Sequence, residues 1–300
     1  SWTFNPAPDV DHSSTTPSFT FKAEIVDTDG DTDSDTHTIT VTDGTDPQDA
    51  VTQSITLDED DLSDGSSPSS SALTQIATLS FTAGSDTLDS FVFNGTAGLD
   101  TDANGTAGLD TAGGEIVWVL NPAATEIKGY VNGNESDGDL AITLTIGGAT
   151  SIAPTNSGDV TVTAVLSDEF ANTFGDDSQT NFNLGSVTVT GSDGDDTVNG
   201  IVNVAVIDDV PSVEISADMT SGSASDTTDS VAEDGSDLTG VITLVEGADQ
   251  NATLNVTLEG TDVLGGPISF TIDGTDQSQT HTVTTVGDDL LGELTVALAT

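Results

Sequence analysis

Cysteine is wholly missing from this sequence, and basic residues are almost wholly missing. It contains no cysteine, so no disulfide framework holds the chain together. It has only 2 basic residues against 52 acidic ones, for a formal net charge of −50 at pH 7. Nucleic acid is excluded as a direct partner, because binding to phosphates requires clustered Lys and Arg, and adsorption to an anionic membrane surface is disfavoured for the same reason. Self-repulsion on this scale destabilises a compact state, and metal ions are the obvious means of offsetting it.

Long apolar runs are also missing. None approaches the roughly 18 residues of a membrane span, so no direct membrane insertion is expected. The N-terminus has no signal-peptide pattern, and the sequence reads as a segment cut from a longer chain at both ends. Hydrophobic residues make up 34% of the chain and aromatic residues 4%, so each core must be thin. Such a composition is typical of disorder, but the alternation of residue types indicates a folded chain.

This alternation is the clearest structural signal in the sequence. Leu140 to Ile146 and Val160 to Leu166 repeat with period two, which indicates strands that bury one face. Further strands are expected at 73–81, 88–93, 116–120, 127–131, 187–190 and 198–207. No stretch shows a convincing helical period. Short strands joined by turns predict an all-β sandwich of antiparallel strands, with Trp118 in its core.

Carboxylates gather between two alternating segments, 19–25 and 38–42. Five of them fall within nine residues: Asp27, Asp29, Asp31, Asp33 and Asp35. They repel one another unless a cation lies among them, and the two basic residues cannot supply it. Ca²⁺ is the natural partner, because it takes about six to eight oxygen ligands; a solvated acidic hairpin turn is the alternative. An EF-hand does not fit, since Thr32 and Thr38 occupy the positions that require Gly and Glu.

The same arrangement recurs 164 residues later, with Pro47 matched by Pro211. The repeat divides the chain into the C-terminal part of one β-sandwich repeat (1–46), a complete repeat (47–210) and the N-terminal part of the next (211–300). Acidic residues at the two predicted joints are expected to share Ca²⁺ ions. They are Asp43, Asp46, Glu59 and Asp60 at the first joint, and Asp208, Asp209, Glu233 and Asp234 at the second. The acidic turn of the complete repeat adds Asp193, Asp195 and Asp196 as candidate ligands.

The order of strand, Asp-x-Asp-Gly-Asp turn, strand, Asp-Asp-x-Pro and a new Glu-Asp corner resembles the repeats of giant type I-secreted adhesins of the repeats-in-toxin (RTX) group. Trp2-Thr-Phe4, followed by Pro8-Asp9-Val10-Asp11-His12, is similar to the aromatic strand and turn before the acidic hairpin of those repeats. The resemblance implies tandem Ig-like or cadherin-like β-sandwich domains with Ca²⁺-binding loops, secreted to the surface of a Gram-negative bacterium. Such repeats are calcium-stiffened extenders that project a binding tip from the cell and support adhesion or biofilm formation. The region around Phe170–Phe174 lacks an Asp-His pair, so the resemblance assigns no role to His12.

No enzyme is expected from this sequence. It has no Cys nucleophile, no Gly-x-Ser-x-Gly or His-Glu-x-x-His motif and no phosphate-cradling glycine loop. Two other functions stay open beside the extender. One is a glycan- or peptide-binding module within such an adhesin, using the duplicated loop at 94–113 or a sheet face; the other is an acidic surface-layer or filament protein. The expected partners are neighbouring repeats of the same chain, Ca²⁺, and a surface glycan or peptide.

Overall fold

The structure is a computed structural model that describes residues 1–99, 116–131, 135, 137–170, 181–216, 241–248, 252–257, 263–264, 268–271, 277–285 and 290–298. Regular structure within these residues consists of β-strands and two short 3₁₀ segments, Glu59–Asp61 and Asp137–Asp139. This confirms the predicted all-β class. Most of the duplicated loop, together with Glu233 and Asp234, lies outside the described residues. In the described part of the chain no helix is long and apolar enough to cross a membrane.

The chain divides into two compact units. The first takes in the described residues of Ser1–Leu57, Ala72–Phe174 and Asn181–Ile207, and the second those of Asp58–Ser71 and Asp208–Thr300. Compactness is a different property from sequence repetition. The predicted division into three repeats therefore stays a prediction.

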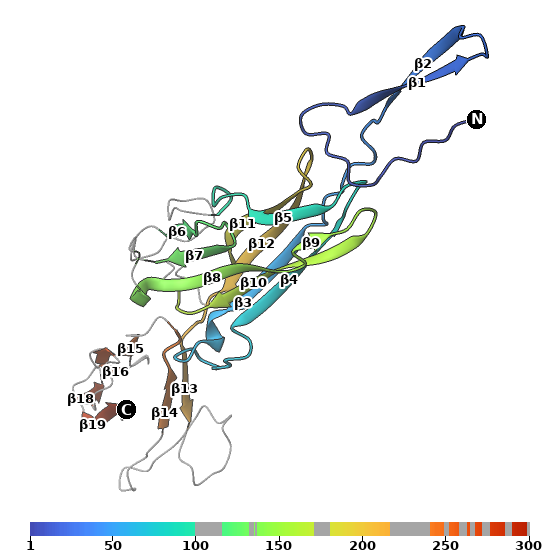
Figure 1. Ribbon diagram of the computed structural model, residues 1–300. Coiled ribbons are helices and arrows are strands. Elements are labelled where there is room, and N and C mark those ends of the chain that lie inside the picture. The colour runs from blue at the N-terminus through green and yellow to red at the C-terminus, as the bar shows by residue number, and fades with distance from the viewer. Residues whose placement is uncertain are drawn as a thin grey trace. The chain divides into compact units, whose positions relative to one another are not determined.

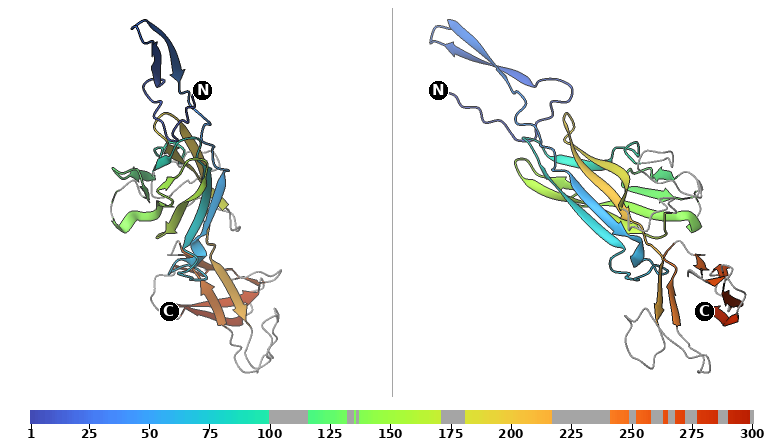
Figure 2. Two further views of the ribbon diagram at one scale, coloured as in Figure 1. Left: turned by 45° about the vertical axis from the view of Figure 1, so that its right-hand side comes forward. Right: turned by 180° about the vertical axis from the view of Figure 1, so that it is seen from behind.

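Two five-stranded sheets form the body of the first unit (Figures 1 and 2). One has the strand order β4-β10-β8-β7-β6 and the other β3-β12-β11-β5-β9. The bounds are β3 (Gln53–Asp58), β4 (Thr74–Thr82), β5 (Leu88–Phe93), β6 (Val117–Leu120), β7 (Glu126–Tyr130), β8 (Leu140–Gly148), β9 (Ser151–Ile152), β10 (Ser157–Leu166), β11 (Asn181–Ser192) and β12 (Thr197–Ile207). Where the register is described, neighbouring strands run antiparallel. The predicted sandwich of antiparallel strands is thus present.

Alternating burial shows how the two sheets pack. The apolar positions from Val160 to Leu166 on β10, predicted as one buried face, are at most 1% exposed. On β12, in the other sheet, buried residues alternate with more exposed ones along the strand. The rings of Phe81 on β4 and Phe91 on β5 lie 5.2 Å apart. A Cβ on Gly200 of β12 would meet the side chains of Leu79 and Phe81, so the sheets touch closely at this point.

Three residues of the first sheet depart from the sequence prediction. Leu140 and Ile146, predicted on the buried face of β8, are only half-buried, whereas Ile142 and Leu144 are buried. Trp118 is half-buried instead of lying in the core. It belongs to β6, which among the described strands has a neighbour on one side only, and its ring lies over Gly129 of β7. An edge strand leaves part of a large side chain exposed.

The first unit also contains a separate two-stranded sheet, β1 (Ser18–Val26) and β2 (Thr32–Thr40), paired without a break in register. Aromatic rings gather on it: Trp2 lies 5.3 Å from Phe21, and Phe4 lies 5.0 Å from Phe19. A two-stranded hairpin alone is marginally stable. These ring contacts give it an apolar layer, although Trp2 remains 58% exposed.

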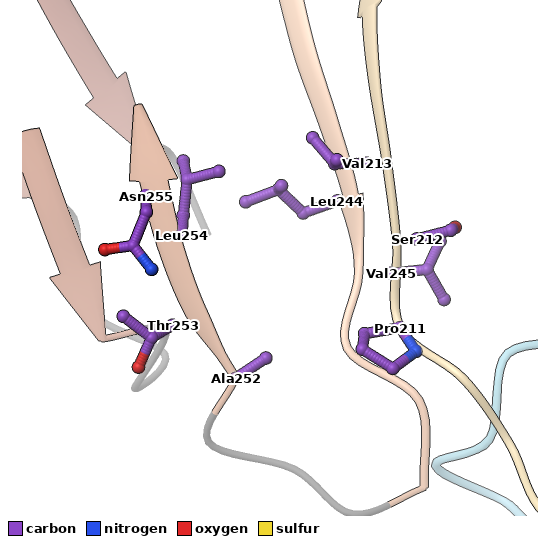
Figure 3. A pocket seen from close by; sticks show the side chains of 9 residues that line it. All are labelled: Pro211, Ser212, Val213, Leu244, Val245, Ala252, Thr253, Leu254 and Asn255. Atoms are coloured by element: carbon purple, nitrogen blue, oxygen red, sulfur yellow. The ribbon is translucent and has the colours of Figure 1, made fainter. Parts of the chain in front are cut away.

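The described strands of the second unit form three small sheets, β13-β14, β15-β17 and β16-β18-β19. Their bounds are β13 (Ser212–Ser216), β14 (Val241–Val245), β15 (Thr253–Val256), β16 (Val263–Leu264), β17 (Ile268–Thr271), β18 (Gln277–Thr285) and β19 (Leu290–Leu298). Leu244 and Leu254 point toward one another across an apolar cavity of about 480 Å³ (Figure 3). The side chains that line it are apolar or uncharged. They offer no acid, base or metal ligand of the kind found in the first unit.

Candidate metal centre

The segment that follows β2 is fixed against the β4–β5 connection. The N–H of Ser85 donates to the carbonyl oxygen of Thr45 at 2.8 Å, and the N–H of Gln48 donates to that of Thr82 at 2.9 Å. Gly84 permits this approach, because a Cβ there would collide with the carbonyl oxygen of Thr45. The exit of the hairpin is therefore held to the sandwich by backbone contacts that only a glycine allows.

A second loop, N-terminal to the hairpin, reaches the same place. The N–H of Asp9 donates to the carbonyl of Ser85 at 3.4 Å, and its carboxylate accepts from the N–H of Thr87 at 2.7 Å. The φ of Asp9 is 63°, in the left-handed region that residues other than glycine adopt rarely. Three residues on, the ring of His12 lies 3.1 Å from the carbonyl oxygen of Val41. This loop is thus tied to both the sandwich and the end of the hairpin.

The third contributor is the tight turn between β11 and β12. The N–H of Asp196 donates to the carboxylate of Asp193 at 2.8 Å. Gly194, with a φ of 112°, adopts the backbone conformation that the turn requires. Asp195 and Asp196 extend from this turn to the other two loops.

Side chains from these loops form two overlapping groups, which we call the junction cluster. One group contains His12, Asp43, Asp86 and Asp195, and the other contains Asp43, Asp46 and Asp196. Within each group one ligand atom of every residue lies within 4.8 Å of the others. A cation that binds oxygen at about 2.3–2.6 Å, as Ca²⁺ does, can contact donors spaced in this way. The protein therefore has acidic groups that could hold a metal ion.

No lysine neutralises the junction cluster. The chain has two basic residues, Lys22 and Lys128. Lys22 donates to Glu24 at 2.5 Å, and the ammonium of Lys128 lies 3.9 Å from the carboxylate of Glu126. Both pairs lie on strands, β1 and β7. The carboxylates at the junction are left to repel one another.

This repulsion contributes to raised pKa values of two carboxyl groups in the cluster. Burial raises the pKa of Asp86, and the charges of Asp195 and Asp43 raise it further. Burial also raises the pKa of Asp196, with Asp46 as the strongest neighbouring charge. In both cases the folded protein disfavours the ionised carboxylate. A bound cation would reverse that preference.

His12 is subject to opposing effects. Burial lowers the pKa of its ring, but the carbonyls of Val41 and Val10 and the carboxylates of Asp43 and Asp195 outweigh burial, so the pKa lies above its ordinary value. The side chain is 10% exposed. The ring is therefore an enclosed group in a strongly negative field.

Two cavities border Asp86, and Asp9 lines both. The smaller, of about 170 Å³, also touches His12 and Asp43. The larger, of about 330 Å³, is lined by Thr87 and six carboxylates: Asp9, Asp11, Asp86, Asp89, Asp193 and Asp195. A cavity of this size and polarity has room for ordered water. Carboxylates and water together are the ligands that hard divalent cations prefer.

The predicted hairpin cluster is only partly assembled. Asp27, Asp29 and Asp31 form an exposed group whose ligand atoms lie within 4.8 Å of one another. Asp33 and Asp35 are not in it, because they belong to β2, where each residue advances the chain by about 3.3 Å. Contact with the carboxyl of Asp29, and hydrogen bonds from the N–H groups of Asp31 and Gly30, lower the pKa of Asp27. The turn therefore stabilises its own negative charge.

The acidic candidates of the second unit are arranged differently. Within the described residues, Glu59, Asp60, Asp208 and Asp209 belong to no group of three candidate ligands. Asp209 is 2% exposed, and its carboxylate accepts from Ser66 N–H at 2.7 Å, from Ser66 Oγ at 2.6 Å and from Ala248 N–H at 3.0 Å. These donors give Asp209 a structural role. Its role as a metal ligand stays a prediction.

Sequence reasoning missed two members of the junction cluster. Asp86 is an isolated acidic residue in the Gly84-Ser-Asp86 connection, and His12 was assigned no role. Neither belongs to a dense acidic run, which was the signal that identified the other candidates. The structure places Asp43 beside Asp86, Asp195 and Asp196, and Asp46 beside Asp196. The expected pairing of Asp43 and Asp46 with Glu59 and Asp60 stays a prediction. The proximity of these loops depends on strand order, which residue density does not reveal.

No protein family matches this sequence, and no curated protein is detectably similar to it.

Proposed function

We propose that this chain is a calcium-stiffened extender segment of a secreted, cell-surface adhesin, built from Ig-like β-sandwich repeats. One observation carries the proposal: the residues leaving the β1–β2 hairpin bring Asp43 beside Asp86, Asp195 and Asp196 of the sandwich, and Asp46 beside Asp196. In the predicted repeat pattern this is the joint between one repeat and the next. The resemblance of the acidic turns and Asp-Asp-x-Pro exits to RTX adhesin repeats supports the same function.

Ca²⁺ fits the all-oxygen part of the junction cluster best. Asp43, Asp46 and Asp196 supply carboxylate oxygens, and Ca²⁺ accepts many oxygen ligands, water among them, in irregular geometry. Mg²⁺ demands a nearly ideal octahedron and is a poorer match to loops of this kind. With the ion bound, mutual repulsion becomes attraction to a common charge. The ion would then clamp the hairpin exit to the sandwich.

The effect on stability follows from mass action. At free Ca²⁺ tenfold above the dissociation constant, one ion contributes about 1.4 kcal/mol to the folded state. A typical domain has only about 5–15 kcal/mol in total. Several sites would make folding depend on the Ca²⁺ concentration, so the chain would fold fully after export from a cytosol low in Ca²⁺. An extender that acts outside the cell would then be stiff where it functions.

Small-angle X-ray scattering of the 300-residue chain tests this function. When millimolar Ca²⁺ is replaced by excess EDTA, the maximum dimension of the chain should fall and the range of its conformations should broaden, because unclamped joints bend. The Asp43→Asn/Asp46→Asn variant should show a weaker Ca²⁺ response. Glu214→Gln removes an exposed charge on β13 that lies outside the junction cluster, and it should respond like the wild type. Identical scattering of the wild type in Ca²⁺ and in EDTA would contradict the proposal.

A further inference from the structure

A hydrogen bond to the backbone fixes which nitrogen of the His12 ring carries a hydrogen. Its Nε2 lies 3.1 Å from the carbonyl oxygen of Val41, and a carbonyl can only accept, so Nε2 carries the hydrogen. The second nitrogen, Nδ1, then carries either a lone pair or an additional proton. A backbone carbonyl that fixes one ring nitrogen in this way is the usual support for a metal-binding histidine.

Nδ1 of His12 is enclosed, and within the described residues no group, the nearby Val10 carbonyl included, lies in hydrogen-bonding geometry with it. The side chain is only 10% exposed, and Nδ1 lies 3.9 Å from a carboxylate oxygen of Asp43, beyond hydrogen-bond reach. A lone pair on Nδ1 would face the negative charge of the Asp43 carboxylate. Two donors at this separation can share an ion that binds each at about 2.0–2.2 Å.

Asp86 is a buried residue in the same place and lines both cavities. It is 8% exposed, and no donor in the described part of the chain hydrogen-bonds to its carboxylate. Buried carboxylates are normally paired or bound to a metal. The enclosed nitrogen of His12 and this carboxylate belong to one group of four candidate ligands, with Asp43 and Asp195. This pairing of buried donors separates the group from an ordinary exposed acidic cluster.

We propose that His12 Nδ1, together with Asp43, Asp86 and Asp195, forms a site for a first-row transition-metal dication of the Zn²⁺ type, distinct from the all-oxygen Ca²⁺ group beside it. Imidazole nitrogen suits Zn²⁺ and its neighbours in the series, whereas Ca²⁺ prefers oxygen alone. One nitrogen and three carboxylates match the four ligands that Zn²⁺ takes in structural sites. Asp43 belongs to both groups. The proposal does not depend on Ca²⁺ binding, because only the first group contains His12.

The test is a calorimetric titration with Zn²⁺. The 300-residue chain is first stripped of metal and then saturated with Ca²⁺, which blocks weak binding of Zn²⁺ to exposed carboxylates. One Zn²⁺ should still bind, and Ca²⁺ should not displace it. His12→Gln keeps an N–H donor for Val41 and removes Nδ1, and it should weaken this binding by about 100-fold or more. His37→Gln, on the exposed strand β2, is the matched control and should bind Zn²⁺ like the wild type.

X-ray absorption of the wild type loaded with one Zn²⁺ supplies a readout that does not require a variant to fold. The spectrum should contain the scattering of one imidazole. Unchanged Zn²⁺ affinity in His12→Gln, a first shell of oxygen alone, or an Nδ1 that stays protonated with Zn²⁺ present would overturn the proposal, the last showing that a proton occupies the site. Zn²⁺ binding without any Ca²⁺ response would contradict the proposed extender function alone, and a Ca²⁺ response without Zn²⁺ binding would contradict only this inference.

Discussion

The junction cluster and the hairpin turn are made from the same residue type, yet their chemistry differs. In the turn, Asp27, Asp29 and Asp31 are neighbours in sequence and exposed, and local hydrogen bonds lower the pKa of Asp27. At the junction, Asp86 and Asp196 come from separate loops, and burial raises their pKa values. Without a cation the pKa of Asp27 is lowered in the turn, whereas the pKa values of Asp86 and Asp196 are raised at the junction. A dense run of aspartates is therefore weaker evidence for a metal than a few aspartates gathered from distant loops.

Among the changes that would affect the junction cluster but not the hairpin turn, Gly84→Ala should have the largest effect on stability. The new Cβ would collide with the carbonyl oxygen of Thr45, so the hairpin exit must leave the sandwich. We expect a loss of about 1–3 kcal/mol in the free energy of unfolding, as for other overpacked sites, together with weaker Ca²⁺ binding. Denaturant unfolding with and without Ca²⁺ measures both effects.

Ser85→Ala is the control for that substitution. It removes a hydroxyl 3.3 Å from the same carbonyl and leaves the backbone hydrogen bonds in place, so it should cost about 0.5 kcal/mol or less. If Gly84→Ala were as stable and as Ca²⁺-responsive as Ser85→Ala, the backbone contact would not be what holds the junction.

Stability should depend on pH with opposite sign in the presence and absence of metal. Burial raises the pKa values of Asp86 and Asp196 above 3.8, and neighbouring carboxylates raise them further. In the pH range just above about 4, these carboxylates of the metal-free folded protein therefore bind more protons than they do in the unfolded chain. The free energy of unfolding of the metal-free protein must fall as pH rises through this window. With Ca²⁺, which binds ionised carboxylates, stability should rise with pH instead.

Thermal unfolding from pH 4 to pH 7, on protein stripped by a chelating resin and on protein in millimolar Ca²⁺, measures this reversal. If metal-free stability rose across the window, the carboxylates would not be strained in the folded state. The pKa of Asp27 is lowered, so its carboxylate contributes stability that rises with pH in both conditions.

The strands were predictable from sequence because burial alternates along them. The segment 88–93 coincides with β5, and the buried positions of β10 are those expected from period two. The prediction for β11 was too short: the strand spans Asn181–Ser192, and a register shift between Asn183 and Gly185 breaks the alternation. Edge position explains the exposure of Trp118, and strand order is a property of the whole sheet that no local pattern contains.

The candidate site was predictable only in part, for a related reason. Asp43, Asp46, Asp195 and Asp196 are conspicuous in acidic runs, so sequence density identified each of them. Their mutual proximity arises because β12 returns beside β3 while the β4–β5 connection meets the hairpin exit. Asp86 and His12 carry no local signal, and only burial within the folded chain distinguishes them.

The most direct test compares how much Ca²⁺ raises the Tm of two paired variants. Asp43→Asn/Asp196→Asn disables the all-oxygen group of the junction, and Asp27→Asn/Asp29→Asn disables the hairpin turn. We expect the junction pair to lose most of the Ca²⁺-dependent rise in Tm seen in the wild type, and the hairpin pair to retain it. A hairpin pair that loses the rise, with a junction pair that keeps it, would contradict the account.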